Sequence, residues 1–319
     1  MADRRIGAVA LLICICLCLM PLRAMAASTS DANEMIVTGR LCDLTVSFRY
    51  GETAFADLPV KLYRVADVSA DFRYTLTAPF AGYGLVLNGI RTNSEWNVIR
   101  STLEANIIAD RITEDASAVT DGSGQVSFSS LRPGLYLAVP GTGAVGDTQY
   151  VFESALVALP GLGTDGYWQY QVAVTAKGAP LPPVDGDSEV SYKILKLWNG
   201  DSSSRRPREI QVEIFRNGES YKTVTLSKDS NWSYTWTAED DGATWTVAER
   251  NVPSGYTATM EKREHTFLLT NTLDPENDPP ENDPPKMGDT TNILLYMLLA
   301  FGSGILLILL GAAGRKKRL

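Results

Sequence analysis

The chain has 319 residues, of which 45% are hydrophobic and 21% charged, so it is long enough for two ordinary domains with additional segments. Its net charge of −8 at pH 7 argues against nucleic acid as a partner, because phosphate backbones bind positive surfaces. His265 is the single histidine and no loop has calcium-type ligand spacing, so we expect neither a metal site nor a cofactor.

Residues 1–27 are predicted to be a secretory signal peptide. A basic start, ADRRIG, precedes the apolar run AVALLICICLCLM and the small-residue segment PLRAMAAS, which offers cleavage near Ala26 or Ala27. An uncleaved anchor helix is the alternative, although the run is shorter than the ~20 residues that span a bilayer. Three of the four cysteines lie in this leader, so Cys42 would have no partner for an internal disulfide.

Residues 36–177 are predicted to form a first domain made mostly of strands. Short runs rich in β-branched and aromatic residues, such as LTVSFRYG and PVKLYRVADV, are bounded by the turn clusters TDGSG and RPG. Within this domain, residues 92–111 instead carry apolar side chains at three- and four-residue spacing, with Asn93 or Ser94 as N-cap. We expect an amphipathic helix packed on a β-sandwich through one narrow stripe, formed by Trp96, Ile99, Leu103 and Ile107. The alternative is a helix that binds a partner.

The segment TDGSGQVSFSSLRPGLYLAV resembles a pattern of the prealbumin-like pilin domains of Gram-positive bacteria, Thr-Asp-x-x-Gly followed by Phe-x-x-Leu-x-Pro-Gly-x-Tyr. The resemblance implies an immunoglobulin-like β-sandwich. Members of that family usually place a glutamate that assists an internal amide crosslink where this chain has Pro140, and the first strand here offers no lysine. We therefore expect no internal crosslink in the first domain.

The end of the first domain, WQYQVAVTAK at 168–177, is similar to the pilin motif Trp-x-x-x-Val-x-Val-Tyr-Pro-Lys. Thr175 and Ala176 replace the usual Tyr-Pro, whereas the matching residues are Trp168, Val172, Val174 and Lys177. In that family the lysine attacks a sortase-bound acyl-enzyme and joins subunits head to tail. The resemblance thus implies that Lys177 makes an intersubunit linkage. The alternative is an ordinary solvated lysine that closes a strand before a flexible linker.

Residues 178–189, rich in Pro, Gly and acidic residues, are predicted to be a linker, and residues 190–273 a second domain. The second domain contains strand-like runs such as EIQVEIF, WSYTWT and HTFLLTN, and turns recur at intervals typical of β-sandwiches.

Three polar residues of the second domain stand in register with apolar neighbours. In SYKILKLW, Lys196 shares one strand face with Tyr192, Ile194 and Trp198, because strand side chains alternate with a period of two. By the same alternation Glu249 shares a face with Trp245 and Val247, and Asn271 with Phe267 and Leu269. If the first and last strands are neighbours, the sequence predicts a Lys196–Glu249–Asn271 trio in one core.

Burial of such a trio favours a chemical reaction. Burial lowers the pKa of an amine and raises that of a carboxylic acid, and it therefore favours a neutral pair. A neutral amine is a nucleophile, a carboxamide is its electrophile, and a protonated carboxyl group can shuttle protons. The outcome would be an amide between Lys196 and Asn271 with loss of ammonia, made once per molecule.

The second domain resembles a CNA-B domain of Gram-positive surface proteins. The residues that carry the resemblance are KLW at 196–198, RP at 206–207, NWSYTW at 231–236, WTVAERNVPSGY at 245–256 and TNT at 270–272. In that family the lysine bonds the asparagine of the final strand with the help of a glutamate, which implies an isopeptide bond between Lys196 and Asn271 assisted by Glu249. The alternative is an ion pair at the domain edge with an incidental asparagine.

The C-terminal part is predicted to anchor the chain. Residues 274–288 form an acidic, proline-rich stalk, 293–314 an uncharged transmembrane helix and 315–319 a basic tail in the cytoplasm. PPKMGDTTN resembles a cell-wall sorting signal, Leu-Pro-x-Thr-Gly, which a sortase cleaves. Its last four positions are occupied by Pro285, Lys286, Met287 and Gly288. Pro284 and Met287 replace the leucine and the threonine, so the alternative is a protein that stays in the membrane.

We therefore expect an exported, all-β protein with two immunoglobulin-like sandwiches in tandem, the first carrying an inserted helix. The leading functional hypothesis is a pilin-like or wall-anchored structural protein whose partners are a sortase and either other pilin subunits or peptidoglycan. An adhesin that binds a host ligand through the first domain is the alternative, with Tyr74, Phe80 and Tyr83 as candidate surface aromatics or as core residues. An enzyme is the weakest hypothesis, because no pattern resembles a catalytic site with turnover.

Overall fold

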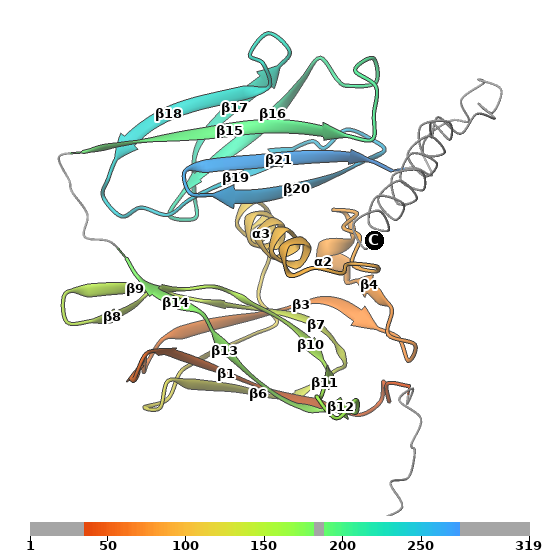
Figure 1. Ribbon diagram of the computed structural model, residues 1–319, viewed down its shortest axis with the longest axis vertical. Helices are drawn as coiled ribbons and strands as arrows, with labels where there is room; N and C mark the ends of the chain where they lie inside the picture. The colour runs from red at the N-terminus through yellow and green to blue at the C-terminus, as the bar shows by residue number, and fades with distance from the viewer. Residues whose placement is uncertain (1–34, 182–187, 275–319) are drawn as a thin grey trace, which may run out of the picture. The chain divides into compact units, whose positions relative to one another are not determined.

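The computed structural model describes residues 35–181 and 188–274 (Figure 1). The predicted signal peptide, the transmembrane segment 293–314, the basic tail and the sorting-like residues Pro285, Lys286, Met287 and Gly288 lie outside the described residues. Among the described residues, no helix combines the length and the apolar character needed to cross a bilayer. The described residues up to Leu273 belong to one compact unit.

The first part of this unit is a β-sandwich. One of its main sheets has the order β13-β1-β2, with β6 also paired to β1, and the other has the order β10-β7-β3-β4, with β5 also paired to β3. The strands are β1 (Cys42–Tyr50), β2 (Thr53–Ala54), β3 (Pro59–Val68), β4 (Tyr74–Leu76), β5 (Ala116–Val119), β6 (Gln125–Leu131), β7 (Gly134–Pro140), β8 (Gly143–Val145), β9 (Thr148–Phe152), β10 (Ala155–Leu159), β11 (Gly161–Leu162), β12 (Trp168–Gln169), β13 (Gln171–Ala176) and β14 (Gly178–Pro180).

β1 lies inside its sheet, and its side chains alternate between the core and the outer face. Cys42, Leu44, Val46 and Phe48 point into the core, while the residues between them face outward. The strand pairs in parallel with β13 and antiparallel with β6, so both of its edges are covered. Its inward side chains belong to the same hydrophobic cluster as Leu62 of β3, which joins the two sheets.

Helix α3 (Asn93–Asp110) follows the short helix α2 (Ala78–Ala81). Its N-cap is Thr92, not Asn93 or Ser94 as predicted, because Thr92 and Glu95 form a reciprocal capping box that satisfies two free N–H groups. The predicted packing on the first sandwich is confirmed, since Leu103 and Ile107 lie in a core cluster with residues of β3 and β7.

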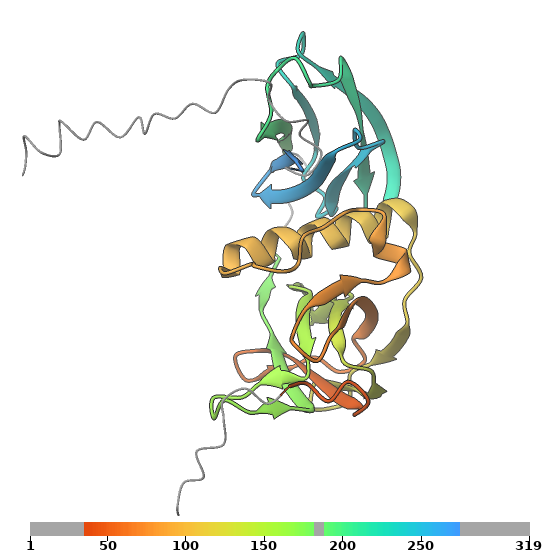
Figure 2. The ribbon, with the colours of Figure 1, turned by 90° about the vertical axis from the view of Figure 1, so that its right-hand side faces the viewer.

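The prediction of one narrow apolar stripe on α3 is incomplete. Thr102 and Ala105 are also buried, at 3% and 1% exposure, and Ala105 belongs to the core cluster of the second sandwich. Figure 2 shows the helix between the strands of the two sandwiches. The helix therefore has two buried faces that serve different cores.

The aromatic residues considered as a ligand surface are mainly core residues. Tyr74 and Phe80 are 8% and 1% exposed and pack in the cluster that contains Leu103. Tyr83 is half-buried, and its hydroxyl donates a hydrogen bond to Asp110. Of the two interpretations of these aromatics, core packing is confirmed for Tyr74 and Phe80.

The second sandwich has a four-stranded sheet of order β18-β15-β21-β20 facing a three-stranded sheet of order β17-β16-β19. Its first and last strands, β15 and β21, run parallel side by side (Figure 1). The all-β prediction of two sandwiches with one inserted helix is confirmed. The strands are β15 (Glu189–Asn199), β16 (Glu209–Arg216), β17 (Glu219–Ser227), β18 (Ser233–Glu239), β19 (Trp245–Arg250), β20 (Tyr256–Arg263) and β21 (Thr266–Leu273).

Candidate functional site

Lys196, Glu249 and Asn271 meet in the core of the second sandwich. The parallel register of β15 and β21 pairs Lys196 with Leu269 and Trp198 with Asn271, so the lysine and the asparagine are near neighbours on one sheet. Glu249 comes from β19, at the edge of the facing sheet. The glutamate therefore reaches the other two side chains across the sandwich.

The carboxylate of Glu249 bridges the other two side chains. Its Oε2 lies 3.0 Å from Lys196 Nζ, and its Oε1 accepts a hydrogen bond of 2.8 Å from Asn271 Nδ2. The lysine also donates to the carbonyl oxygen of Leu269 at 3.4 Å. Each oxygen of one carboxylate thus holds one of the two groups that would react.

All three side chains are shielded from water. The side chains of Lys196 and Glu249 are 0% and 1% exposed, and Asn271 is 0% exposed as a whole residue. Asn271 Oδ1 has no hydrogen-bond partner within the described part of the chain. Burying an ion pair and an unsatisfied amide oxygen costs on the order of several kcal/mol of folding free energy. As a purely structural feature, the trio would therefore destabilise the domain.

Burial also changes the acidity of the lysine. Loss of solvent lowers the pKa of Lys196 from 10.5 to about 8, although the nearby carboxylates of Glu249 and Asp201 act in the opposite direction. A fraction of the amine is consequently neutral near physiological pH, and only the neutral amine is nucleophilic.

Trp198, Asp201, Arg206 and Tyr256 form a cap over the lysine. Sequence reasoning did not assign the last three to the site. The ring centroid of Trp198 is 4.7 Å from Lys196 Nζ, and the guanidinium of Arg206 lies 5.8 Å from the same ring. Arg206 pairs with Asp201 at 2.9 Å, and Asp201 accepts a 2.9 Å hydrogen bond from the hydroxyl of Tyr256. Arg206 and Tyr256 lie within the segments that carry the family resemblance. Their place in those segments is the signal that could have identified them as residues of the site.

Lys177 is exposed and lies between β13 and β14, and its carbonyl oxygen accepts a hydrogen bond of 2.8 Å from the Glu153 N–H. The predicted linker does not begin directly after it, because Gly178–Pro180 pair with β9. Gly178 permits this pairing, since a Cβ at that position would lie 2.4 Å from the ring of Phe152. The lysine is therefore accessible on the first sandwich, directly before the short strand β14.

Residues 192–272 match the family model of the Cna protein B-type domain. The matched range includes Lys196, Glu249 and Asn271, and we refer to this part as the Cna B-type domain. A collagen adhesin of Staphylococcus aureus is 33% identical in an alignment of 97 residues that covers 28% of this chain and 8% of that protein. This chain thus spans only a small part of the length of that relative.

Solved structures of surface proteins and pilins are similar at low identity. A single B repeat unit of the collagen-binding surface protein of Staphylococcus aureus is 15% identical, with 73% of this chain and 97% of that chain covered and a TM-score of 0.26. The full-length major pilin SpaD of Corynebacterium diphtheriae is 12% identical, with 76% and 100% covered and a TM-score of 0.28.

Proposed function

We propose that this chain is a structural protein of a Gram-positive cell surface, pilin-like or wall-anchored, whose Cna B-type domain locks itself with an amide bond between Lys196 and Asn271. The single observation that carries the proposal is the buried trio in which one carboxylate holds both reacting side chains, at 3.0 and 2.8 Å. The match of residues 192–272 to the Cna B-type family supports it. The reaction happens once per molecule, so the chain is not an enzyme with turnover.

The proposed chemistry begins with a proton transfer. Lys196 Nζ gives a proton to Glu249 Oε2, to which it is already paired, and both groups become neutral. The amine then attacks Cγ of Asn271 to form a tetrahedral intermediate. The Cγ–Nδ2 bond breaks, the amide nitrogen leaves as ammonia with a proton relayed by Glu249, and a new Cγ–Nζ bond remains. Of the five N–H protons at the start, one stays on the new amide and three leave with ammonia. The fifth remains on Glu249, which ionises again when the departing ammonia takes up this proton and leaves as ammonium, so the carboxyl group is not consumed.

The orientation of Asn271 suits the state before proton transfer. An ionised Glu249 accepts from the Asn271 N–H group and leaves Oδ1 without a partner among the described residues. Once Glu249 is protonated, its O–H can donate to Oδ1 after the carboxamide rotates about its Cβ–Cγ bond. That hydrogen bond would polarise the carbonyl at the moment of attack, which is when charge develops on the oxygen.

The bond would have a mechanical role because of where it lies. The second sandwich, which contains the Cna B-type domain, begins with β15 at Glu189 and ends with β21 at Leu273. A tensile force on the two chain ends would pass from β15 through the Lys196–Asn271 bond into the end of β21. The strands between these residues would carry almost no load.

Intact mass of the purified unit ending at Leu273 tests the proposal. The wild type is expected to weigh less than its calculated mass by one ammonia, and a digest should contain a branched peptide that joins Lys196 to Asn271. Lys196→Ala, Asn271→Ala and Glu249→Gln should each restore the calculated mass. Lys193→Ala, an exposed lysine on the same strand, is the control that should keep the deficit. A wild type at full calculated mass would refute the proposal.

We further propose that a sortase joins this chain to other pilin subunits or to peptidoglycan, with Lys177 as the acceptor amine and residues 285–288 as the sorting signal. The exposure of Lys177 supports this role. Cell-wall extracts are expected to show a ladder of high-mass species that Lys177→Ala abolishes and that the exposed Lys228→Ala leaves intact. A ladder that survives Lys177→Ala would rule out this lysine. Burial of Tyr74 and Phe80 removes two of the three aromatic residues named for the adhesin alternative, whereas Tyr83 is half-buried.

A further inference from the structure

The Cna B-type domain has an open side where two strands end their sheets. β20 is the last strand of the four-stranded sheet and β19 the last strand of the facing sheet. An edge strand exposes unpaired N–H and C=O groups, and the gap between two sheet edges exposes the core behind it. Proteins cover such edges, and here the cover comes from the first sandwich.

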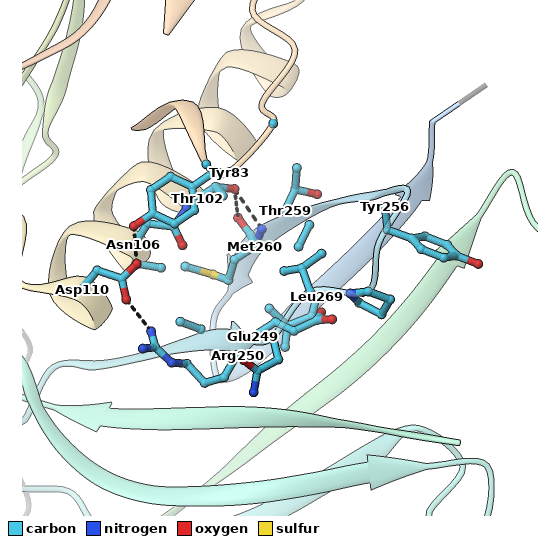
Figure 3. Close-up of a pocket in the computed structure, with 18 of the residues that line it drawn as sticks. Tyr83, Thr102, Asn106, Asp110, Glu249, Arg250, Tyr256, Thr259, Met260 and Leu269 are labelled. Carbon is cyan, nitrogen blue, oxygen red and sulfur yellow. Dashed lines mark hydrogen bonds and ion pairs between the residues drawn. The ribbon is translucent and has the colours of Figure 1, made fainter. Parts of the chain in front are cut away.

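Helix α3 supplies this cover through two small residues. The Met260 N–H of β20 donates a 2.9 Å hydrogen bond to Thr102 Oγ1, which also lies 3.3 Å from the Met260 carbonyl oxygen (Figure 3). Ala105, one turn further along, is 1% exposed and packs in the core of the Cna B-type domain. The hydroxyl oxygen of Thr102 therefore accepts from the Met260 N–H, as a carbonyl oxygen of a further strand would, while its own proton has the Val98 carbonyl oxygen at 2.7 Å as the nearer acceptor.

Polar contacts fix both margins of this docking. Arg250 of β19 pairs with Asp110, near the end of α3, at 2.7 Å. On the other margin, Thr257 Oγ1 donates to the carbonyl oxygen of Gly84 at 3.1 Å. Gly84 lies between α2 and α3, so these contacts join the helix to β19 and the segment before it to β20.

A cavity of about 460 Å³ separates α3 from the crosslinking site (Figure 3). Thr102, Ala105 and Asp110 line it from the helix. Glu249 and Leu269 line it from the Cna B-type domain, and these are the two residues whose oxygens contact Lys196 Nζ. Withdrawal of the helix would remove the wall of this cavity that faces Glu249.

We propose that helix α3 of the first sandwich is a positioning element of the crosslinking site, docked by Thr102 and Ala105, and that the amide forms rapidly only when the helix closes the β19–β20 side. This inference rests on the proposed Lys196–Asn271 bond and adds what controls it. Closure holds β19, and with it Glu249, against the opposite sheet and keeps solvent from its carboxyl group. Because the first sandwich precedes the second in the chain, it can fold first and offer the helix as a template.

The test compares the rate of crosslinking in two variants of the compact unit ending at Leu273. Each variant introduces a negative charge on a different face of α3. Ala105→Asp places a carboxylate in the docking face, and Asn97→Asp places one at an exposed position of the same helix. Newly translated chains are sampled over time by intact mass. Ala105→Asp is expected to slow ammonia loss roughly 10- to 100-fold, since small displacements of reacting groups have effects of this size, whereas Asn97→Asp keeps the wild-type rate.

Thr102 gives a second pair of variants with a conservative rescue. Thr102→Val keeps the side-chain shape but leaves the Met260 N–H without its acceptor, so crosslinking should slow and hydrogen exchange at the Met260 amide should rise. Thr102→Ser restores the acceptor and should restore both. Folding of the first sandwich is checked in each variant by protection of the Cys42 thiol from alkylation, because Cys42 is 1% exposed and burial raises its pKa to about 11.

The outcomes separate the two proposals. A wild type without the ammonia deficit overturns the amide bond and the role of the helix together. A wild type that crosslinks, with Ala105→Asp and Thr102→Val reacting at the wild-type rate while Met260 exchange rises, overturns the role of the helix alone. Unchanged Met260 exchange in both variants overturns the docking itself. Slow crosslinking in both variants, with Cys42 still protected and with rescue by Thr102→Ser, supports the inference.

Discussion

Asn271→Ala is expected to lower the free energy of unfolding of the Cna B-type domain by about 4–5 kcal/mol, the loop-closure contribution of a covalent link between residues as distant in sequence as Lys196 and Asn271. The variant loses the amide bond but keeps the Lys196–Glu249 ion pair at 3.0 Å, so neither buried charge is left without its partner. For a domain of this size the loss corresponds to a fall in Tm on the order of 20–30 °C.

Lys196→Ala should be less stable than Asn271→Ala. It loses the same bond and also leaves the carboxyl group of Glu249, 1% exposed, without its partner. Removal of one member of a buried pair costs about 3–5 kcal/mol, so the expected order of stability is wild type, Asn271→Ala, Lys196→Ala. Thermal and urea unfolding measure the order, with Lys193→Ala as the matched lysine control. Equal stability of wild type and Asn271→Ala would contradict the covalent link.

The position of the trio could be predicted because each member interrupts an apolar strand face. A period of two suffices to place Lys196, Glu249 and Asn271 inward, and all three side chains are buried. The alternation could not show that Glu249 approaches from the opposite sheet, because that depends on β19 pairing with β16. Strand pairing is a long-range choice that local periodicity does not encode.

Features that depend on distant partners were not predictable in this way. Thr102 and Ala105 are small, stand outside the stripe of large apolar residues and are buried at the contact with the second sandwich. The cap formed by Asp201 and Tyr256 joins residues far apart in sequence. The N-cap of α3, in contrast, could have been predicted from the local sequence, since Thr92 and Glu95 have the spacing of a capping box.

The stability of Asn271→Ala is expected to depend on pH in a way that the wild type does not. In this variant Lys196 remains an amine, and its burial lowers its pKa to about 8, against 10.5 when the chain is unfolded. Between these values the unfolded chain holds a proton that the native chain has released, so stability rises with pH. The gain from pH 8 to 10.5 should approach about 3 kcal/mol, from ~1.4 kcal/mol for each unit of pKa difference.

The wild type is the matched control for this measurement. Its Lys196 nitrogen would be an amide and would not titrate, while every other ionisable group, including the partly buried Lys262 with its lowered pKa, is common to both chains. The difference in unfolding free energy between wild type and Asn271→Ala should therefore shrink as pH rises from 8 to 10.5. Below pH 8 the difference should be constant, because both states of the variant then keep the lysine proton. A difference that stays flat across the whole range would mean that Lys196 does not titrate as a buried amine, and the nucleophile of the proposed reaction would lack its activation.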